Sequence, residues 1–245
     1  MESYTETEPR FAPRLVKERF DKARAEIGSL RGKFAKDRPV RLLAVTKTVP
    51  VEVINYAIDE LGVDAIGENR VQELLEKYES LHSPAGKKLE IHLIGSLQTN
   101  KVKYIADKVD MIESVDSEKL AAEIDKQCKK LGRKMDVLIE VNIGREEQKG
   151  GVMPEDVGML AEKLREFDSI VLRGLMTIAP VTDSHDEYIK HFGEVHEIFE
   201  KMKQIHGEDF DTLSMGMSGS FPEAIECGAT EIRLGSSLFG KRNYQ

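Results

Sequence analysis

Short apolar runs recur along the chain, and each is followed by a longer stretch with mixed polarity. The runs are rich in Val, Ile and Leu, and they begin at Arg41, Asp64, Glu90, Asp110, Asp136, Val171, Thr212 and Glu231. Uninterrupted apolar runs that end in small or polar residues are typical of buried parallel strands, which are apolar on both faces. The pattern therefore predicts eight parallel strands.

The stretches between these runs carry apolar residues at helical spacing. Helices are expected at 53–61, 120–131 and 189–202, and one more at 15–30, before the first strand. Alternation of strand and helix about eight times favours an α/β protein with a single closed (β/α)8 barrel of the TIM type and an extra N-terminal helix. A doubly wound sheet is the alternative that the same alternation allows.

Composition narrows the class of protein. The 245 residues carry a formal net charge of −8, which argues against a general nucleic-acid binder. No apolar run approaches the roughly 20 residues that span a bilayer, and the N-terminus lacks the pattern of a secretory signal. We expect a cytoplasmic protein without nucleic-acid or membrane partners. Residues 1–10 are expected to form a flexible acidic tail, and residues 11–245 the barrel domain.

A lysine, Lys47, stands at the end of the first apolar run, LLAV. In barrels of this type, functional groups gather at the carboxyl ends of the strands. Burial of an ammonium group is costly, and the cost falls when the amine is neutral or is used covalently as an imine. Lys47 is therefore a candidate covalent anchor. A lysine that reaches solvent or pairs with a carboxylate would fit the same position.

The last two runs end in small residues, in SMGMSGS from Ser214 and IRLGSS from Ile232. Backbone N–H groups in such turns can approach a phosphate, and the phosphate site of these barrels commonly follows strands seven and eight. Ser218, Gly235 and Ser236 are therefore predicted to form a phosphate cradle, with Arg233 pointing into the barrel. Turns without a ligand, and an ion pair for Arg233, are the alternatives.

Other patterns in the sequence are less informative about function. His92 lies within the third run, either as a core residue or as a residue that lines the site. The polar loop 144–154 follows a predicted strand and is either a mobile lid or an ordinary solvated loop. HEIFE at His196 is not the HExxH motif, so no metal site is predicted. Serine-elbow, Walker and dinucleotide motifs do not occur in the sequence.

Taken together and in order, several segments resemble the pyridoxal phosphate homeostasis protein family over about residues 42–242. They are AVTKTVP, IGENRVQE, HLIGSLQTNK, VNIGREEQKGG, RGLMTIAP and LSMGMSGSFPEAIECGATEIRLGSSLFG. The resemblance implies a fold type III barrel, similar to the N-terminal domain of alanine racemase, with pyridoxal 5′-phosphate (PLP) as its cofactor.

The resemblance also implies roles for individual residues. Lys47 matches the Schiff-base lysine, and Arg233 matches the partner of the pyridine nitrogen. The positions that match the phosphate cradle are Ser218, Gly235 and Ser236, and those that match the pocket lining are Asn69 and His92.

Two positions depart from the family pattern. The family often has Asp where this chain has Ser220, which puts a local helix cap or contact in doubt. It often has Thr where this chain has Ser236, and there the hydroxyl is retained.

The resemblance implies a protein that holds PLP for vitamin B6 homeostasis, with PLP-dependent apoenzymes as the partners to consider and without catalytic residues of its own. The alternative is a PLP-dependent racemase or lyase. Racemisation needs a second proton donor opposite the lysine, which in alanine racemase is a tyrosine of a separate C-terminal domain. This chain ends about eight residues after Ser237, so that domain is expected to be absent. A phosphate-binding barrel without PLP is a third reading.

Overall fold

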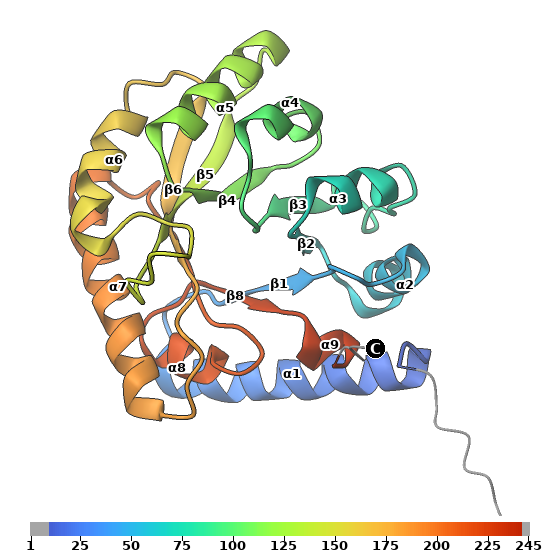
Figure 1. Ribbon diagram of the computed structural model, residues 1–245. Helices are drawn as coiled ribbons and strands as arrows, with labels where there is room; N and C mark the ends of the chain where they lie inside the picture. The colour runs from blue at the N-terminus through green and yellow to red at the C-terminus, as the bar shows by residue number, and fades with distance from the viewer. Residues whose placement is uncertain (1–9, 242–245) are drawn as a thin grey trace, which may run out of the picture.

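Eight strands pair in the order in which they follow one another, and β8 closes the barrel against β1 (Figure 1). The computed structural model describes residues 10–241. The strands, all paired in parallel, are β1 (Arg41–Val45), β2 (Ala65–Glu68), β3 (Glu90–Leu93), β4 (Met111–Val115), β5 (Met135–Val141), β6 (Ile170–Thr177), β7 (Thr212–Ser214) and β8 (Glu231–Leu234). The predicted barrel is confirmed, since a doubly wound sheet would leave two open edges.

Helices surround the strands as the spacing of apolar residues predicted. They are α1 (Pro13–Phe34), α2 (Val51–Leu61), α3 (Val71–Tyr78), α4 (Val102–Ile105), α5 (Glu118–Leu131), α6 (Val157–Leu164), α7 (His185–His206), α8 (Phe221–Glu226) and α9 (Ser236–Phe239), with short 3-10 turns η1 (Thr99–Lys101) and η2 (Pro154–Asp156). Among the described helices, none is long and apolar enough to cross a membrane.

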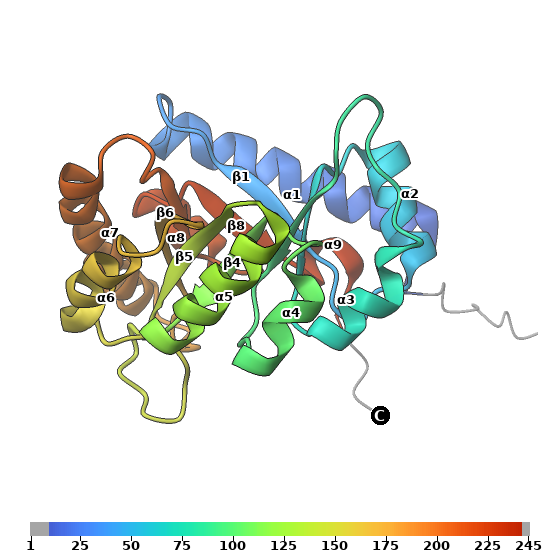
Figure 2. The same cartoon turned by 90° about the horizontal axis from the view of Figure 1, so that it is seen from above.

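The extra helix α1 lies along one side of the barrel, next to α8 and α9 (Figures 1 and 2). Its buried face consists of Val16, Phe20, Ala23 and Ile27, which recur at helical spacing. The ring of Phe20 meets the ring of Phe239 in α9 edge to face, with centroids 5.5 Å apart. Helix α1 therefore supports the turns that follow β7 and β8 from behind.

The start of the chain adds a further contact on this side. Arg10, the last residue of the expected acidic tail, donates a hydrogen bond from its Nε to the carbonyl of Phe239, at 3.0 Å. Residues 1–9 lie outside the described residues.

The loop 144–154, for which the sequence allowed either a lid or an ordinary solvated loop, folds back onto β5. Val152 forms a parallel bridge with Val141, and the N–H of Val152 donates to the carbonyl of Glu140 at 2.9 Å. At the start of the loop, the side-chain amide of Asn142 donates to the carbonyl of Glu146, at 2.9 Å. Any opening of this loop would have to break these bonds.

Candidate functional site

Lys47 lies in a tight turn directly after β1. The N–H of Val49 donates to the carbonyl of Thr46 at 3.0 Å, which closes the turn around a half-buried Lys47. The next residue, Thr48, has φ 60°, a left-handed conformation that a β-branched residue rarely adopts. Such strain persists only where the surroundings hold the backbone in place.

Lys77 of α3 supplies much of that restraint. Its ammonium donates to the carbonyl of Thr46 at 2.9 Å, to Glu68 at 2.9 Å and to Glu73 at 2.6 Å. Glu73 also accepts the N–H of Thr48, and Glu68 accepts the hydroxyl of Thr46 at 2.7 Å. Burial raises the pKa of Glu68, and Lys77 opposes that rise. The cluster joins the ends of β1 and β2 to α3 and so fixes the turn that carries Lys47.

Asn69 follows β2 at the same end of the barrel. Its Oδ1 is buried and has no hydrogen-bond partner among the described residues. Gly95 packs so closely on the backbone of Asn69 that a Cβ at position 95 would clash with it. An unpaired buried amide oxygen costs about 1–3 kcal/mol. A ligand that brings a donor to this place would recover that cost.

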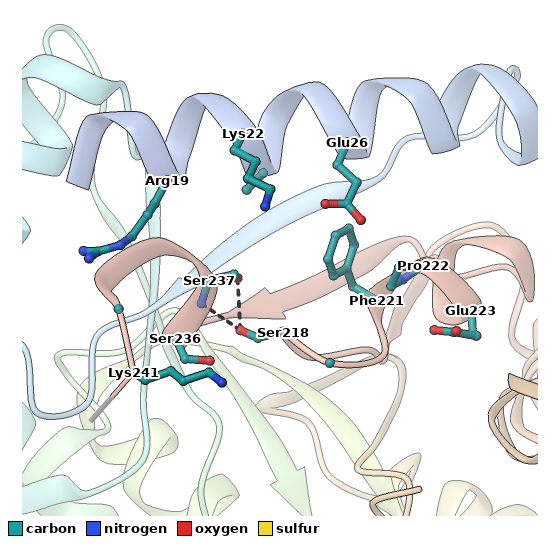
Figure 3. Close-up of a pocket in the computed structure, with 13 residues that line it drawn as sticks. Arg19, Lys22, Glu26, Ser218, Phe221, Pro222, Glu223, Ser236, Ser237 and Lys241 are labelled. Carbon is teal, nitrogen blue, oxygen red and sulfur yellow. Dashed lines mark hydrogen bonds between the residues drawn. The ribbon is translucent and has the colours of Figure 1, made fainter. Parts of the chain in front are cut away.

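The turns after β7 and β8 meet through two serines (Figure 3). The hydroxyl of Ser218 accepts the N–H of Ser237 at 3.1 Å and lies 3.0 Å from the Ser237 hydroxyl. A Cβ at Gly235 would lie 3.4 Å from the Cβ and the carbonyl oxygen of Val45. The predicted cradle therefore adjoins the end of β1, two residues before Lys47.

Ser220 keeps the turn after β7 closed although it replaces the family's usual Asp. Its hydroxyl accepts the N–H of Met217 at 3.2 Å, inside the turn, and does not cap α8. Gly216 in the same turn has φ 91°, and a Cβ there would lie 2.5 Å from the Cβ of Ala224. Ser220 therefore makes a contact within the turn, and no side-chain cap of α8 is formed.

A cavity of about 470 Å³ lies between these turns and α1. The turns contribute Ser218 and Ser236, and α1 contributes Arg19 and Lys22 (Figure 3). This volume is in the usual range for small-molecule sites. Among the described residues, Lys47 is not part of this lining.

Arg233 of β8 lies inside the barrel with 3% of its surface exposed. One terminal nitrogen, Nη1, donates to the hydroxyl of Ser214 at 2.7 Å, and Nη2 donates to the carbonyl of Thr177 at 2.8 Å. Both terminal nitrogens are thus engaged, and no described residue hydrogen-bonds to Nε. Three of the five guanidinium N–H groups are left by these two bonds, and the N–H of Nε is the one that we consider for a ligand.

His92 of β3 is fully buried in the interior of the barrel. Its Nδ1 lies 2.7 Å from Glu113 and its Nε2 lies 2.8 Å from Glu90. Burial alone would lower the pKa of His92, but the charge of Glu231, the hydrogen bonds to Glu113 and Glu90 and the charge of Glu113 raise this pKa to about 10. His92 is therefore a charged imidazolium at neutral pH. It is separated from Arg233 by the Glu113 carboxylate and the Ser214 hydroxyl.

Glu113 and Glu231, the two acids next to His92, have pKa values shifted in opposite directions. Burial raises the pKa of Glu113, but the hydrogen bond and charge of His92, with the charge of Arg233, hold it below its usual value. Burial and the neighbouring Glu113 raise the pKa of Glu231 to about 7. His92, Glu113 and Glu231 bring ligand-type atoms within 4.8 Å of one another, and both ring nitrogens of His92 are engaged by the carboxylates of Glu113 and Glu90.

Sequence reasoning missed the residues that support the predicted ones. Glu113 lies in the run DMIESV, where an acid between buried apolar residues was the available signal. Ser214 and Lys77 carried no such signal, because a strand serine and a helix lysine are common. Glu140, on β5, has a pKa raised to about 7 by burial and by Asp116, and it too was missed.

Comparisons with known proteins show which proteins this chain resembles. Residues 20–243 match the model of the alanine racemase N-terminal domain. The chain is 46% identical over 204 residues to the pyridoxal phosphate homeostasis protein of Aquifex aeolicus, covering 83% of this chain and 88% of that protein. It is 41% identical over 206 residues to that of Haemophilus influenzae, covering 84% of this chain and 86% of that protein.

Two solved structures are similar to this chain over most of its length. PipY of Synechococcus elongatus with PLP bound matches with a TM-score of 0.76 and 33% identity, over 88% of this chain and 99% of PipY. An alanine racemase of Clostridium difficile matches with a TM-score of 0.69 and 20% identity, over 91% of this chain and 58% of the racemase. The second likeness concerns the fold alone.

Proposed function

The chain belongs to the pyridoxal phosphate homeostasis protein family, and from this membership we propose that it binds PLP through a Schiff base on Lys47 and serves vitamin B6 homeostasis. One observation carries the proposal: the turn after β8, at Gly235, adjoins Val45 at the end of the strand that leads to Lys47, and Arg233 of β8 pairs in register with Leu43 of the same strand. The amine of Lys47 matches the aldehyde of PLP, the hydroxyl and N–H donors of the cradle match its phosphate, and the cation of Arg233 matches its ring nitrogen.

Lys47 would supply the covalent link. Its neutral amine condenses with an aldehyde, so that a carbon–nitrogen double bond replaces the carbonyl and one water is released. The strained turn, held by Lys77, Glu68 and Glu73, supports this role because it fixes the position from which the side chain projects. A fixed attachment point is what a covalent anchor requires.

Ser218, Gly235 and Ser236 would bind the phosphate. The hydroxyls of Ser218 and Ser236 line the cavity, and the backbone at Gly235 lies beside Val45. Small residues let N–H groups approach the anion closely. Arg19 and Lys22 of α1 add positive charge on the outer side of this cavity.

Arg233 would face the pyridine nitrogen with its Nε–H, with Asn69 nearby in the surroundings. His92, predicted to line the pocket, would contribute indirectly, because both its ring nitrogens bind carboxylates in the barrel interior. An arginine at this place tends to leave the ring nitrogen unprotonated, which weakens the ring as an electron sink. The unpaired Oδ1 of Asn69 supports the presence of a polar group in the pocket.

We also propose that the protein holds PLP without catalysing a reaction. The alternative is a PLP-dependent racemase. Racemisation requires a second proton donor on the ring face opposite the lysine. The described tyrosines, Tyr56, Tyr78, Tyr104 and Tyr188, lie on helices, and none of them lines the cavity at the cradle. We therefore propose that the protein holds PLP and passes it on, with PLP-dependent apoenzymes as recipients. Sustained racemisation of an amino acid by the purified, PLP-loaded protein would overturn this part.

Titration of the purified protein with PLP, followed by absorbance, tests the binding itself. An imine band should appear and saturate at one PLP per chain. Pyridoxal, which lacks the phosphate, is the matched control and should bind far more weakly, because the cradle contributes nothing to it. A chain that stays colourless with excess PLP would refute the proposal.

A further inference from the structure

We propose that Glu113 and Ser214, with His92 behind them, are positioning residues that fix the orientation of Arg233 toward the ring of PLP. This inference rests on the proposed function and adds to that function a role for a buried network. The network runs across the interior of the barrel, because β4 and β7, which carry Glu113 and Ser214, are not neighbours in the sheet.

The links of this network are short and continuous. His92 Nδ1 lies 2.7 Å from Glu113 Oε1. The hydroxyl of Ser214 has Glu113 Oε2 as its nearer acceptor, at 2.6 Å, and Glu231 Oε1 as a second, at 3.0 Å. The same hydroxyl accepts from Arg233 Nη1 at 2.7 Å. Each member is buried, so every link is formed in a low-dielectric environment in which hydrogen bonds are strong.

Ser214 separates two charges that would otherwise pair directly. Arg233 Nη1 and Glu113 Oε2 are 3.9 Å apart, too far for a hydrogen bond. Arginine and a carboxylate prefer a bidentate pair with parallel N–H···O bonds. A direct pair would turn the guanidinium toward β4. The serine hydroxyl between them lets Glu113 stabilise the positive charge without rotating the group.

Glu113 is in turn held by His92. The imidazolium binds Glu113 through Nδ1 and Glu90 through Nε2, and Glu90 forms a bidentate pair with Arg41. The side chain of Glu90 is 35% exposed, so the network begins near solvent and ends at Arg233. With Nη1 on Ser214 and Nη2 on Thr177, the plane of the guanidinium is fixed and Nε–H is left to face the ligand.

The substitution Ser214→Ala tests this inference. Without the hydroxyl, Glu113 should capture Arg233 directly and turn Nε away. We expect the affinity for PLP to fall by about tenfold or more, since a hydrogen bond to a charged group is worth roughly that factor. The absorption spectrum of the bound PLP should shift, while borohydride should still trap PLP on Lys47. A merely structural role would lower the melting temperature and leave the spectrum of bound PLP unchanged.

Two further variants make the result interpretable. Ser169→Ala removes a buried serine hydroxyl that lies outside the network, and it should leave affinity and spectrum as in the wild type. Glu113→Gln keeps the size of the side chain and removes its charge, and it should shift the spectrum in the same direction as Ser214→Ala. Unchanged affinity and spectrum in both Ser214→Ala and Glu113→Gln would overturn the inference. A wild-type protein that forms no adduct would instead refute the proposed function.

Discussion

Two sectors of the barrel interior have opposite character. In the first, which we call the apolar sector, Leu43, Val45, Ala65 and Ile94 pack together beneath the turn that carries Lys47. In the second, the charged sector, the buried side chains are His92, Glu113, Ser214, Glu231 and Arg233. The two sectors support the two groups that we propose to hold opposite parts of one ligand.

The difference shows that the two groups need different kinds of support. A covalent anchor needs a fixed backbone, which close packing of apolar side chains provides. A buried cation such as Arg233 needs compensating charge and complete hydrogen bonding, or its burial is prohibitive. On the Lys47 side, packing fixes the strand and the Lys77 cluster at its end fixes the turn. On the Arg233 side, the network has to act inside the barrel itself.

The largest effect should come from removing the covalent anchor above the apolar sector. Lys47→Ala should abolish the imine band completely and leave the melting temperature of the cofactor-free protein nearly unchanged, because the barrel core does not include this amine. Absorbance with added PLP and a thermal melt measure both quantities. Lys87→Ala, in an exposed lysine outside the site, is the control and should keep the band. A band of wild-type intensity in Lys47→Ala would contradict the assignment.

The next largest effect should come from one substitution in each sector, compared by the free energy of unfolding and by the spectrum of bound PLP. Leu43→Ala should lower the free energy of unfolding by about 2–5 kcal/mol, through loss of packing. Glu113→Ala should cost about 3–5 kcal/mol, because it leaves buried charges unpaired. Urea unfolding of the cofactor-free variants measures both costs.

Only Glu113→Ala should change the spectrum of bound PLP. The comparison fails if Leu43→Ala shifts that spectrum as much, or if Glu113→Ala costs less than about 1 kcal/mol.

The charged sector should also make stability depend on pH. The pKa of His92 is raised from 6.5 to about 10 on folding, so the folded state binds the proton more tightly. Its contribution to stability is complete below pH 6.5 and is lost as the pH rises through about 10. Between pH 7 and 10, the wild type should lose more free energy of unfolding than His92→Gln, by a few kcal/mol, since one pKa unit corresponds to about 1.4 kcal/mol.

The acids with a pKa near 7, Glu140 and Glu231, titrate mostly below this window and contribute little to the difference. Parallel pH profiles of the wild type and His92→Gln would show that His92 is not charged in the folded protein.

The smallest effect should come from the cradle. Ser236→Ala removes one hydroxyl that lines the cavity, while neighbouring N–H groups and Ser218 remain. We expect affinity for PLP to fall by about fivefold, in line with the net value of one hydrogen bond, and affinity for pyridoxal to stay the same. Ser29→Ala, on the exposed side of α1, serves as the control. An equal loss for PLP and pyridoxal would mean that Ser236 does not contact the phosphate.

The sequence allowed the apolar sector to be predicted much better than the charged one. All eight apolar runs are strands of the barrel, and α1, α2, α5 and α7 lie where the helical spacing placed them. Lys47 and the glycine and serine turns were visible because strand ends are recognisable along the chain. The link from Glu113 to Ser214 joins residues 101 positions apart, across the barrel interior. Periodicity describes which face a residue occupies, and it carries no information about which residue faces it from the opposite strand.

The support of the Lys47 turn escaped prediction for a similar reason. Lys77 lies on a helix that also exposes Gln72 and Glu76 to solvent, and only the folded chain brings its ammonium to Thr46 and Glu68. Likewise, the cavity wall that α1 contributes could not be read from the helix itself, since Arg19 and Lys22 resemble any solvated basic positions.

Peptide mapping after borohydride reduction of the PLP-loaded protein tests the central claim most directly. Reduction converts the imine to a stable secondary amine, so the modified residue can be identified by mass spectrometry. The account predicts that PLP is attached to the peptide that contains Lys47, at about one equivalent per chain. Attachment mainly to another lysine, or no attachment at all, would contradict it.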